Sequence, residues 1–219
     1  MSSGTAISGA LPGFIAASCV VRRGRVYKDG ALRHEVHART ARAFLEEVYA
    51  AETISYPKFY KMDPLSQLGF LATELLLEGT QLADVRGTAP LGPEDVGVIL
   101  ANTNASLDTD VRYYRTVAEM PSPALFVYTL PNIVIGEICI RHGFKGENAF
   151  FVFKAFHATF ITQYVQGLFA AGLVKACVCG WVEVLDNDYD AALFLVEETG
   201  TTPFTAENLK KIYDRPWTN

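Results

Sequence analysis

The residues of this sequence that could support chemistry form few specific motifs. The chain contains no GxxxxGK[ST] phosphate loop, no GxGxxG after a strand pattern, and no HExxH or GxSxG sequence. His34 and His37 are three residues apart, but they lie in a charged stretch, which favours surface histidines over a metal site. His142 stands at the end of an expected helix, where the partial negative charge favours a capping role for its imidazole. The sequence therefore indicates no metal ion and no cofactor.

Two further spacings have a simpler structural interpretation. Cys177 and Cys179 alternate along an expected strand, which favours buried, reduced thiols over a redox pair. The four cysteines include no CxxC pair, so we expect neither a disulfide framework nor a zinc site. Asp186, Asp188 and Asp190 alternate as in a calcium loop, but the glycine and the distal glutamate are missing. This pattern favours a solvated turn.

Composition and charge limit the class of protein. Half of the 219 residues are apolar, which is enough to bury a core, and no apolar stretch approaches the ~20 residues of a membrane span. With 19 basic and 24 acidic residues the net charge is −5, which disfavours general nucleic-acid binding. Residues 1–13 lack the pattern of a signal peptide and are expected to be a loose lead-in. The expected compartment is the cytoplasm, and residues 14–219 are expected to form a single domain.

Strand patterns alternate with amphipathic helices along the chain. Strands are expected at Phe14–Val21, Gly97–Ala101, Ala149–Phe153, Lys175–Val184 and Ala191–Glu198. Helices are expected at Thr40–Ala51, from the N-cap Asp63 to Gly79, and at Ser106–Glu119, Pro131–Arg141, Ala158–Ala171 and Ala206–Tyr213. This alternation predicts an α/β fold, with helices on both faces of the sheet. Because the last two strands fit an antiparallel pair, the prediction is a mixed sheet of about five strands.

A short hairpin is expected after the first strand, because Arg23-Gly24 and Asp29-Gly30 are turn sequences. Its tip carries Arg22, Arg23, Arg25 and Lys28. A solvated edge hairpin is the simpler interpretation, and a dock for an acidic partner is the functional alternative.

Three segments resemble a known family in order and spacing. The first is FYKMD at 59–63, which runs into an Ala/Leu-rich helix, and the second is LPNxxxGEIxxRxGFKGEN at 130–148, which precedes an apolar strand. The third is the expected helix 158–171, followed by GLVKA at 172–176 and GWVE at 180–183. Together they resemble the N-terminal half of a β-ketoacyl-[acyl-carrier-protein] synthase over about residues 14–198. The resemblance implies a half-unit of the thiolase fold.

The resemblance also implies where a nucleophilic cysteine would lie. In that family the cysteine occupies the turn between a strand and the next helix, where the helix N-terminus activates the thiol. Counted from Gly146-Glu147-Asn148, this position falls on Ala155, and an alanine cannot form a thioester. The chain also ends before the half that would bring two catalytic histidines. His157 and Thr159 are weak substitute candidates for a catalytic residue.

The same region contains the candidate acyl-chain and interface residues. These are Phe151, Phe153, Lys154, Phe156 and His157. Core packing is the alternative role for the aromatic rings. Proteins of this fold dimerise through the strand before the nucleophile turn, here Ala149–Phe153. The expected assembly is a homodimer, or a heterodimer with a full-length ketosynthase, and an acyl carrier protein is a further candidate partner.

Three functions remain open at this point. The first is a non-catalytic, chain-length-factor-like subunit of fatty-acid or polyketide-type biosynthesis, because the scaffold is retained and the nucleophile is absent. The second is an active condensing or acyl-transfer enzyme that uses another residue, such as His157. The third is a binding module for acyl chains or for an acyl carrier protein, which the basic hairpin could contact.

Overall fold

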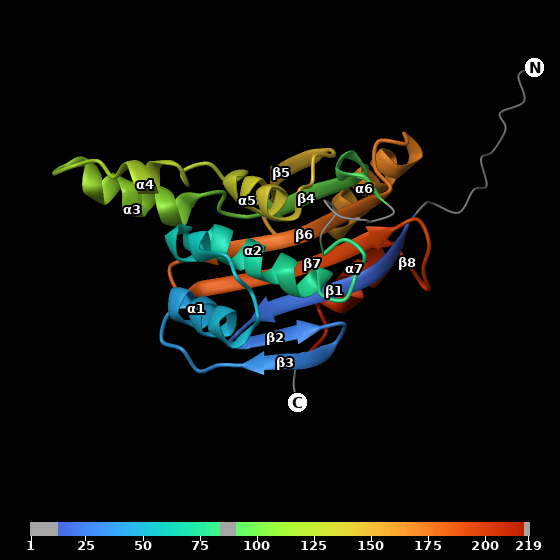
Figure 1. The fold of residues 1–219 in the computed structure, drawn as a ribbon, viewed down its shortest axis with the longest axis horizontal. Coiled ribbons are helices and arrows are strands. Elements are labelled where there is room, and N and C mark those ends of the chain that lie inside the picture. Colours follow the sequence, from blue (N-terminus) through green and yellow to red (C-terminus); the bar gives the residue numbers. More distant parts are fainter. Residues whose placement is uncertain (1–12, 84–90, 217–219) are drawn as a thin grey trace, which may run out of the picture.

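The computed structural model describes residues 13–83 and 91–216, in which one mixed sheet lies between two layers of helices (Figure 1). The strands are β1 (Phe14–Arg22), β2 (Arg25–Lys28), β3 (Ala31–Glu35), β4 (Val96–Asn102), β5 (Asn148–Val152), β6 (Ala176–Leu185), β7 (Asp188–Glu197) and β8 (Thr202–Pro203). Their order is β3-β2-β1-β7-β6-β4-β5, and β8 pairs with β1. Strand β4 runs parallel to β5 and β6, whereas the pairs β6–β7 and β7–β1 are antiparallel.

The predicted α/β class and the mixed sheet are confirmed, but the number of strands is wrong. The five expected strands are present as β1 and β4 to β7, and three further strands bring the described sheet to eight. The hairpin strands β2 and β3 are rich in charged residues, so they lack the apolar pattern of a buried strand. Strand β8 has two residues, which is too short for a periodic signal.

Helices cover both faces of the sheet, as predicted. On one face lie α1 (Ala41–Ala51), α2 (Pro64–Leu77) and α5 (Ile133–His142), and on the other lie α6 (Ala158–Ala170) and α7 (Ala206–Tyr213) (Figure 1). Two short 3-10 helices, Pro57–Lys61 and Pro93–Asp95, precede α2 and β4. Helices α3 (Leu107–Val117) and α4 (Pro123–Phe126) form an arm that extends past the sheet (Figure 1). Among the described residues no helix could cross a membrane.

The two cysteines of β6 illustrate how the sheet divides its core between the faces. Cys177 and Cys179 are fully buried on the face covered by α6, whereas Val178 and Val182 pack on the face covered by α2. This two-residue alternation is that of a strand buried on both sides. The prediction of buried thiols on one side of the strand is confirmed.

The turn between β6 and β7 is shorter than the sequence suggested. Asp188 and Asp190 already belong to β7, and Asp186 forms the turn with a left-handed φ of 53°. In the described part of the chain, no three His, Cys, Asp or Glu side chains are placed to hold a metal ion.

Helix α2 begins as predicted, and its N-cap also holds the arm. Asp63 Oδ1 accepts a hydrogen bond of 3.0 Å from Ser66 N, and Pro64 occupies the first helical position. Asp63 Oδ2 accepts a hydrogen bond of 2.7 Å from Thr109 Oγ1 in α3. Burial raises the pKa of Asp63, although these hydrogen bonds oppose the shift. One buried carboxyl group therefore caps α2 and fixes the start of α3.

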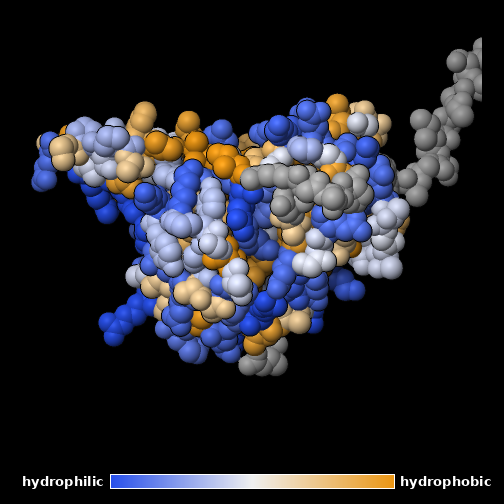
Figure 2. Space-filling model, viewed as in Figure 1, coloured by the Kyte–Doolittle hydropathy of each residue, from blue (hydrophilic) through white to orange (hydrophobic). Residues whose placement is uncertain are grey.

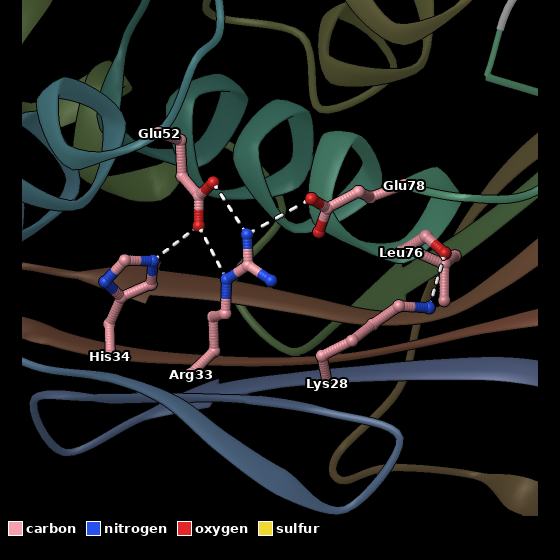
Figure 3. A network of polar contacts seen from close by, with 6 residues as sticks. All are labelled: Lys28, Arg33, His34, Glu52, Leu76 and Glu78. Atoms are coloured by element: carbon pink, nitrogen blue, oxygen red, sulfur yellow. Dashed lines mark hydrogen bonds and ion pairs between the residues drawn. The ribbon is translucent and has the colours of Figure 1, made fainter.

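The basic hairpin tip is largely neutralised within the chain. Arg22 pairs with Asp190 at 2.9 Å, and Arg25 pairs with Glu35 at 2.7 Å. Lys28 Nζ lies 3.0 Å from Asp29 Oδ2 and also donates to the Leu76 carbonyl oxygen at 2.8 Å (Figure 3). Only Arg23 of the four cations is exposed without a described contact. The tip therefore does not present the concentrated positive charge expected of a dock for an acidic partner.

Strand β3 is attached to the helices by a further polar network (Figure 3). Arg33 donates to both carboxylate oxygens of Glu52 at 3.1 Å, and its Nη2 also lies 3.1 Å from Glu78. His34 Nε2 contacts the same Glu52 carboxylate, so this histidine is part of the network and not a free surface group. These contacts hold the edge hairpin against the ends of α1 and α2.

His142 lies in the last turn of α5, but it does not cap that helix. Its ring is buried, with Nε2 3.1 Å from Glu74 Oε1 and Nδ1 3.2 Å from the Ala83 carbonyl oxygen. Arg141 makes two hydrogen bonds to the same carboxylate, at 2.7 and 2.9 Å. Burial alone would raise the pKa of Glu74, but these partners outweigh it and lower the pKa to about 2. Glu74 thus attaches α5 to α2.

We predict that Glu74→Gln lowers the free energy of unfolding at pH 7 by about 2–3 kcal/mol, because Arg141 and His142 lose their anionic partner. The pKa of Glu74 is about 2 in the folded chain and ~4.3 in an unfolded chain. Its contribution to the free energy of unfolding is therefore complete above pH ~4.3 and is lost as the pH falls toward 2. Urea unfolding should therefore show a difference between variant and parent that shrinks from pH 7 to pH 3. Glu47→Gln, at an exposed position on α1, is the control and should leave the free energy of unfolding unchanged at both pH 7 and pH 3. An equal destabilisation at both pH values would contradict this account.

Candidate functional site

The candidate site is the turn between β5 and α6, residues 153–157. Strand β5 lies beside β4 in parallel, and Phe153 N donates to the Asn102 carbonyl oxygen at 2.9 Å where the two strands end. His157 is the N-cap of α6, and its Nδ1 accepts a hydrogen bond of 3.2 Å from Phe160 N. Ala155 is exposed in the middle of this turn. The structure therefore places Ala155 between a strand end and a helix start, where the resemblance put it.

The loop after β4 is held rigidly beside this turn. Asn102 is fully buried and exchanges two hydrogen bonds of 2.8 Å with the backbone of Ala105, whose φ of 49° is left-handed. The Glu183 carboxylate on β6 accepts hydrogen bonds from Thr103 N at 2.6 Å and Asn104 N at 3.3 Å. Glu183, the last residue of the GWVE segment, thus has a structural role that connects β6 to this loop.

A cavity of about 630 Å³ opens beside the turn. Residues from five parts of the chain line it: Thr103, Ala155–Thr159, Trp181, Glu183, Asp190, Lys210, Tyr213 and Asp214. Residues 155, 156, 157 and 159 of this lining were singled out from the sequence. No signal in the sequence indicated that Trp181 or Tyr213 lines the cavity. Trp181 is placed there by the pairing of β6 with β7, and Tyr213 by the packing of α7 against the sheet.

The cavity contains no activated nucleophile among its described lining residues. Ala155 offers only a methyl group, and Thr159 is exposed without a described base beside it. His157 uses Nδ1 to cap α6, and no described hydrogen bond orients its ring against a hydroxyl or a thiol. These groups line the cavity and can contact a ligand there.

The four cysteines of the chain are all described, and none reaches the turn. Burial raises the pKa of Cys19 to about 12 and that of Cys139 to about 11. Burial, together with the neighbouring Cys177, also raises the pKa of Cys179. Cys19, Cys177 and Cys179 are fully buried in the sheet, and Cys139 is half-buried in α5. A thiol that stays protonated is a poor nucleophile. None of the four cysteines lines the cavity beside Ala155.

Five rings near the turn form an aromatic cluster on the edge of the sheet. They are Phe151, Phe153, His157, Phe160 and Tyr164. Phe151 lies edge-on to Phe160 at 4.8 Å and to Tyr164 at 5.0 Å, and Phe153 lies 4.8 Å from Phe160. Four of the rings are only partly buried and His157 is exposed, so the cluster is a surface feature.

The other candidate residues of this segment point in different directions. Phe156 stacks on Tyr213 of α7 at 4.2 Å, so it belongs to the interior of the cavity and not to the edge. Phe150 packs against the core on the α2 face, and Lys154 is exposed. The five residues proposed from sequence therefore divide between the aromatic cluster, the cavity and solvent.

Apolar side chains also gather along the adjacent rim of the molecule. Figure 2 shows them over the region of α4, α5 and β5. The large exposed ones on the arm and the rim are Leu107, Val111, Tyr114, Val117, Met120, Phe126, Val127, Leu130, Ile140 and Val152. Val152 is 54% exposed although it lies in a strand, because β5 is the last strand of the sheet. The apolar strand expected at Ala149–Phe153 is therefore partly exposed at the edge of the sheet.

Comparisons with known proteins give no match by family model and none among curated proteins. Solved structures do match. A chain of the ishigamide ketosynthase/chain length factor has a TM-score of 0.59 at 18% identity, with 86% of this chain and 62% of that chain covered. A chain of AntDE:AntF, a type II acyl-carrier protein in complex with its ketosynthase, has a TM-score of 0.58 at 16% identity. The match covers 85% of this chain and 62% of that chain.

A third structure is closer to this chain in length. It is the ketosynthase ApeO in complex with its chain length factor ApeC from Xenorhabdus doucetiae, with a TM-score of 0.55 at 14% identity, and 93% of this chain and 90% of that chain are covered. The present chain thus spans about 60% of the first two chains and nearly all of the third. At these identities the matches establish the fold. The chain has the thiolase-like fold of a chain-length-factor or ketosynthase half.

We predict that Ala155→Cys creates a reactive thiol in a protein whose native thiols are inert. The new side chain would lie in an exposed turn before the N-terminus of α6, where a thiolate is favoured. Alkylation by iodoacetamide at pH 7, followed by mass spectrometry, should be about 100-fold faster at residue 155 than at the native cysteines. Lys154→Cys is the control for exposure and should react more slowly than Ala155→Cys. Equal rates for the two variants would show that the turn does not activate position 155.

Proposed function

We propose that the chain is a cytoplasmic, non-catalytic subunit, similar to a chain length factor, that pairs with a ketosynthase in polyketide or fatty-acid-type biosynthesis. The observation that carries the proposal is Ala155, an exposed alanine in a turn whose strand, helix and supporting loop are intact. The inert thiols and the capping role of His157 support the same conclusion. We find no observation that favours an active enzyme based on His157.

The free edge of β5 supports pairing with another chain. An exposed edge strand presents unpaired backbone groups and is a site of association unless something covers it. Strand β5 has no partner beyond it in the described sheet, and its residues are at most partly buried. The aromatic cluster and the apolar rim adjoin this edge, so hydrophobic burial would reinforce strand pairing.

A ketosynthase is the proposed partner on this edge. Two of the similar structures are complexes of a ketosynthase and a chain length factor, which supports a heterodimer for a chain of this fold. A complex with an acyl carrier protein is known for another of them. We propose that a carrier protein is met by the assembled pair, since three of the four hairpin cations are neutralised within this chain. A homodimer through the same strand is the alternative outcome of the test.

We predict that Phe151→Lys abolishes this pairing, because it places a charge in the aromatic cluster at the centre of the proposed interface. The parent chain, co-expressed with a ketosynthase from the same genome, should elute as a heterodimer in size-exclusion chromatography with light scattering. Leu32→Lys is the matched control, since Leu32 is 43% exposed on β3 at the opposite edge of the sheet, and it should leave the heterodimer intact.

Circular dichroism of both variants separates loss of pairing from loss of folding. A folded Phe151→Lys variant that still forms the heterodimer would show that β5 is not the interface. A homodimer that persists without the ketosynthase, and is lost in this variant, would assign the same edge to a second copy of the chain.

A further inference from the structure

The C-terminal helix α7 closes one side of the cavity beside Ala155. Lys210, Tyr213 and Asp214 from its end line the cavity, opposite Ala155 and Trp181. In Figure 1 the helix lies on the same face of the sheet as α6. The width of the cavity therefore depends on where the end of α7 is held.

Tyr213, the last residue of α7, is held on three sides. Its ring stacks on Phe156 at a centroid distance of 4.2 Å and an interplanar angle of 20°. The guanidinium carbon of Arg22 lies over the Tyr213 ring, 4.6 Å from its centroid, and the Tyr213 hydroxyl donates to Asp190 Oδ2 at 2.7 Å. Arg22 Nη1 also donates to the Tyr213 carbonyl oxygen at 2.9 Å. One side chain thus joins α7 to β1, to β7 and to the turn that contains Ala155.

The rest of α7 is held more weakly. Leu209 is its only fully buried residue, Ala206 and Ile212 are partly buried against the core, and Glu207, Lys210 and Lys211 are exposed. A segment with few buried apolar contacts opens locally more readily than the core. The attachment of the helix end therefore depends on Tyr213 and its partners.

The polar contacts around Tyr213 are also imperfect. Arg22 Nε lies 2.9 Å from Asp190 Oδ1 but outside hydrogen-bond geometry. Arg22 Nη2 is buried and has no hydrogen-bond partner among the described residues. A buried donor without an acceptor costs free energy in the closed arrangement and lowers the cost of opening.

We propose that Arg22, Asp190 and Tyr213 form a latch that holds α7 closed over the cavity beside Ala155, and that release of this latch opens the cavity. Opening removes Tyr213 from Phe156 and exposes the apolar side of the cavity formed by Phe156 and Trp181. The latch lies within this chain alone, so it stands or falls independently of the proposed ketosynthase partner.

Amide hydrogen exchange, read by mass spectrometry, measures the opening of α7 directly. Arg22→Gln and Tyr213→Ala each remove a main contact and should speed exchange in residues 206–213 by about tenfold, with β6 unchanged. Tyr213→Phe keeps the ring and loses only the hydroxyl, so it should speed exchange by about threefold. Lys211→Ala, exposed on the same helix, is the control and should have no effect.

Access to the cavity is read from Trp181, which is 3% exposed and is one of two tryptophans in the chain. In a Trp217→Phe background, Trp181 is the only tryptophan, and acrylamide should quench its fluorescence at least about twofold more strongly after Arg22→Gln or Tyr213→Ala. Exchange and quenching equal to those of the parent in all latch variants would overturn the proposal. Faster exchange of β6 together with α7 would also overturn it, because the residues would then stabilise the whole fold and not a local closure.

Discussion

The structure depends on one constraint at the carboxyl ends of its parallel strands. Strands β4 and β5 end side by side, and the hydrogen bond from Phe153 N to the Asn102 carbonyl oxygen fixes the point where the chain leaves the sheet for α6. The loop after β4 is itself locked by the Asn102–Ala105 pair and by Glu183. A turn held this firmly presents residue 155 at the start of a helix, whatever its side chain. The chemistry available at this turn therefore depends on that side chain, and Ala155 offers only a methyl group.

The same frame leaves an apolar surface exposed along one edge of the sheet. The edge position of β5 leaves backbone groups and half-buried rings available, and the arm and the rim continue the apolar surface beyond the strand. Opposite charges secure the other parts: Glu74 holds α5 on α2, and Glu52 holds the hairpin on α1. Ion pairs thus hold the helices and the hairpin in place, whereas apolar side chains remain exposed along one edge of the sheet.

Much of the fold could be predicted from the sequence, because its signals are local. The N-cap Asp63, the helix limits of α7 and the alternation of Cys177 and Cys179 are each readable from neighbouring residues. The number of strands was too low because β2 and β3, which form the expected hairpin, lack the apolar pattern of a buried strand, and β8 has only two residues. The position of Ala155 could be predicted from the motif before it.

The places of Tyr213, Trp181 and Arg22 could not be predicted, because only the pairing of the strands and the packing of α7 against the sheet bring them together. His142 was misjudged as a helix cap, because its partner Glu74 is distant in sequence.

The central claim is that this chain supports condensation without carrying the growing acyl group. The most direct measurement is intact-protein mass spectrometry of a reconstituted mixture of this chain, a ketosynthase from the same genome, and an acyl carrier protein loaded with acyl and malonyl groups. The account predicts that product forms only when both proteins are present, and that the acyl adduct is found on the ketosynthase and never on this chain. An acyl adduct on this chain, or condensation by this chain without the ketosynthase, would contradict it.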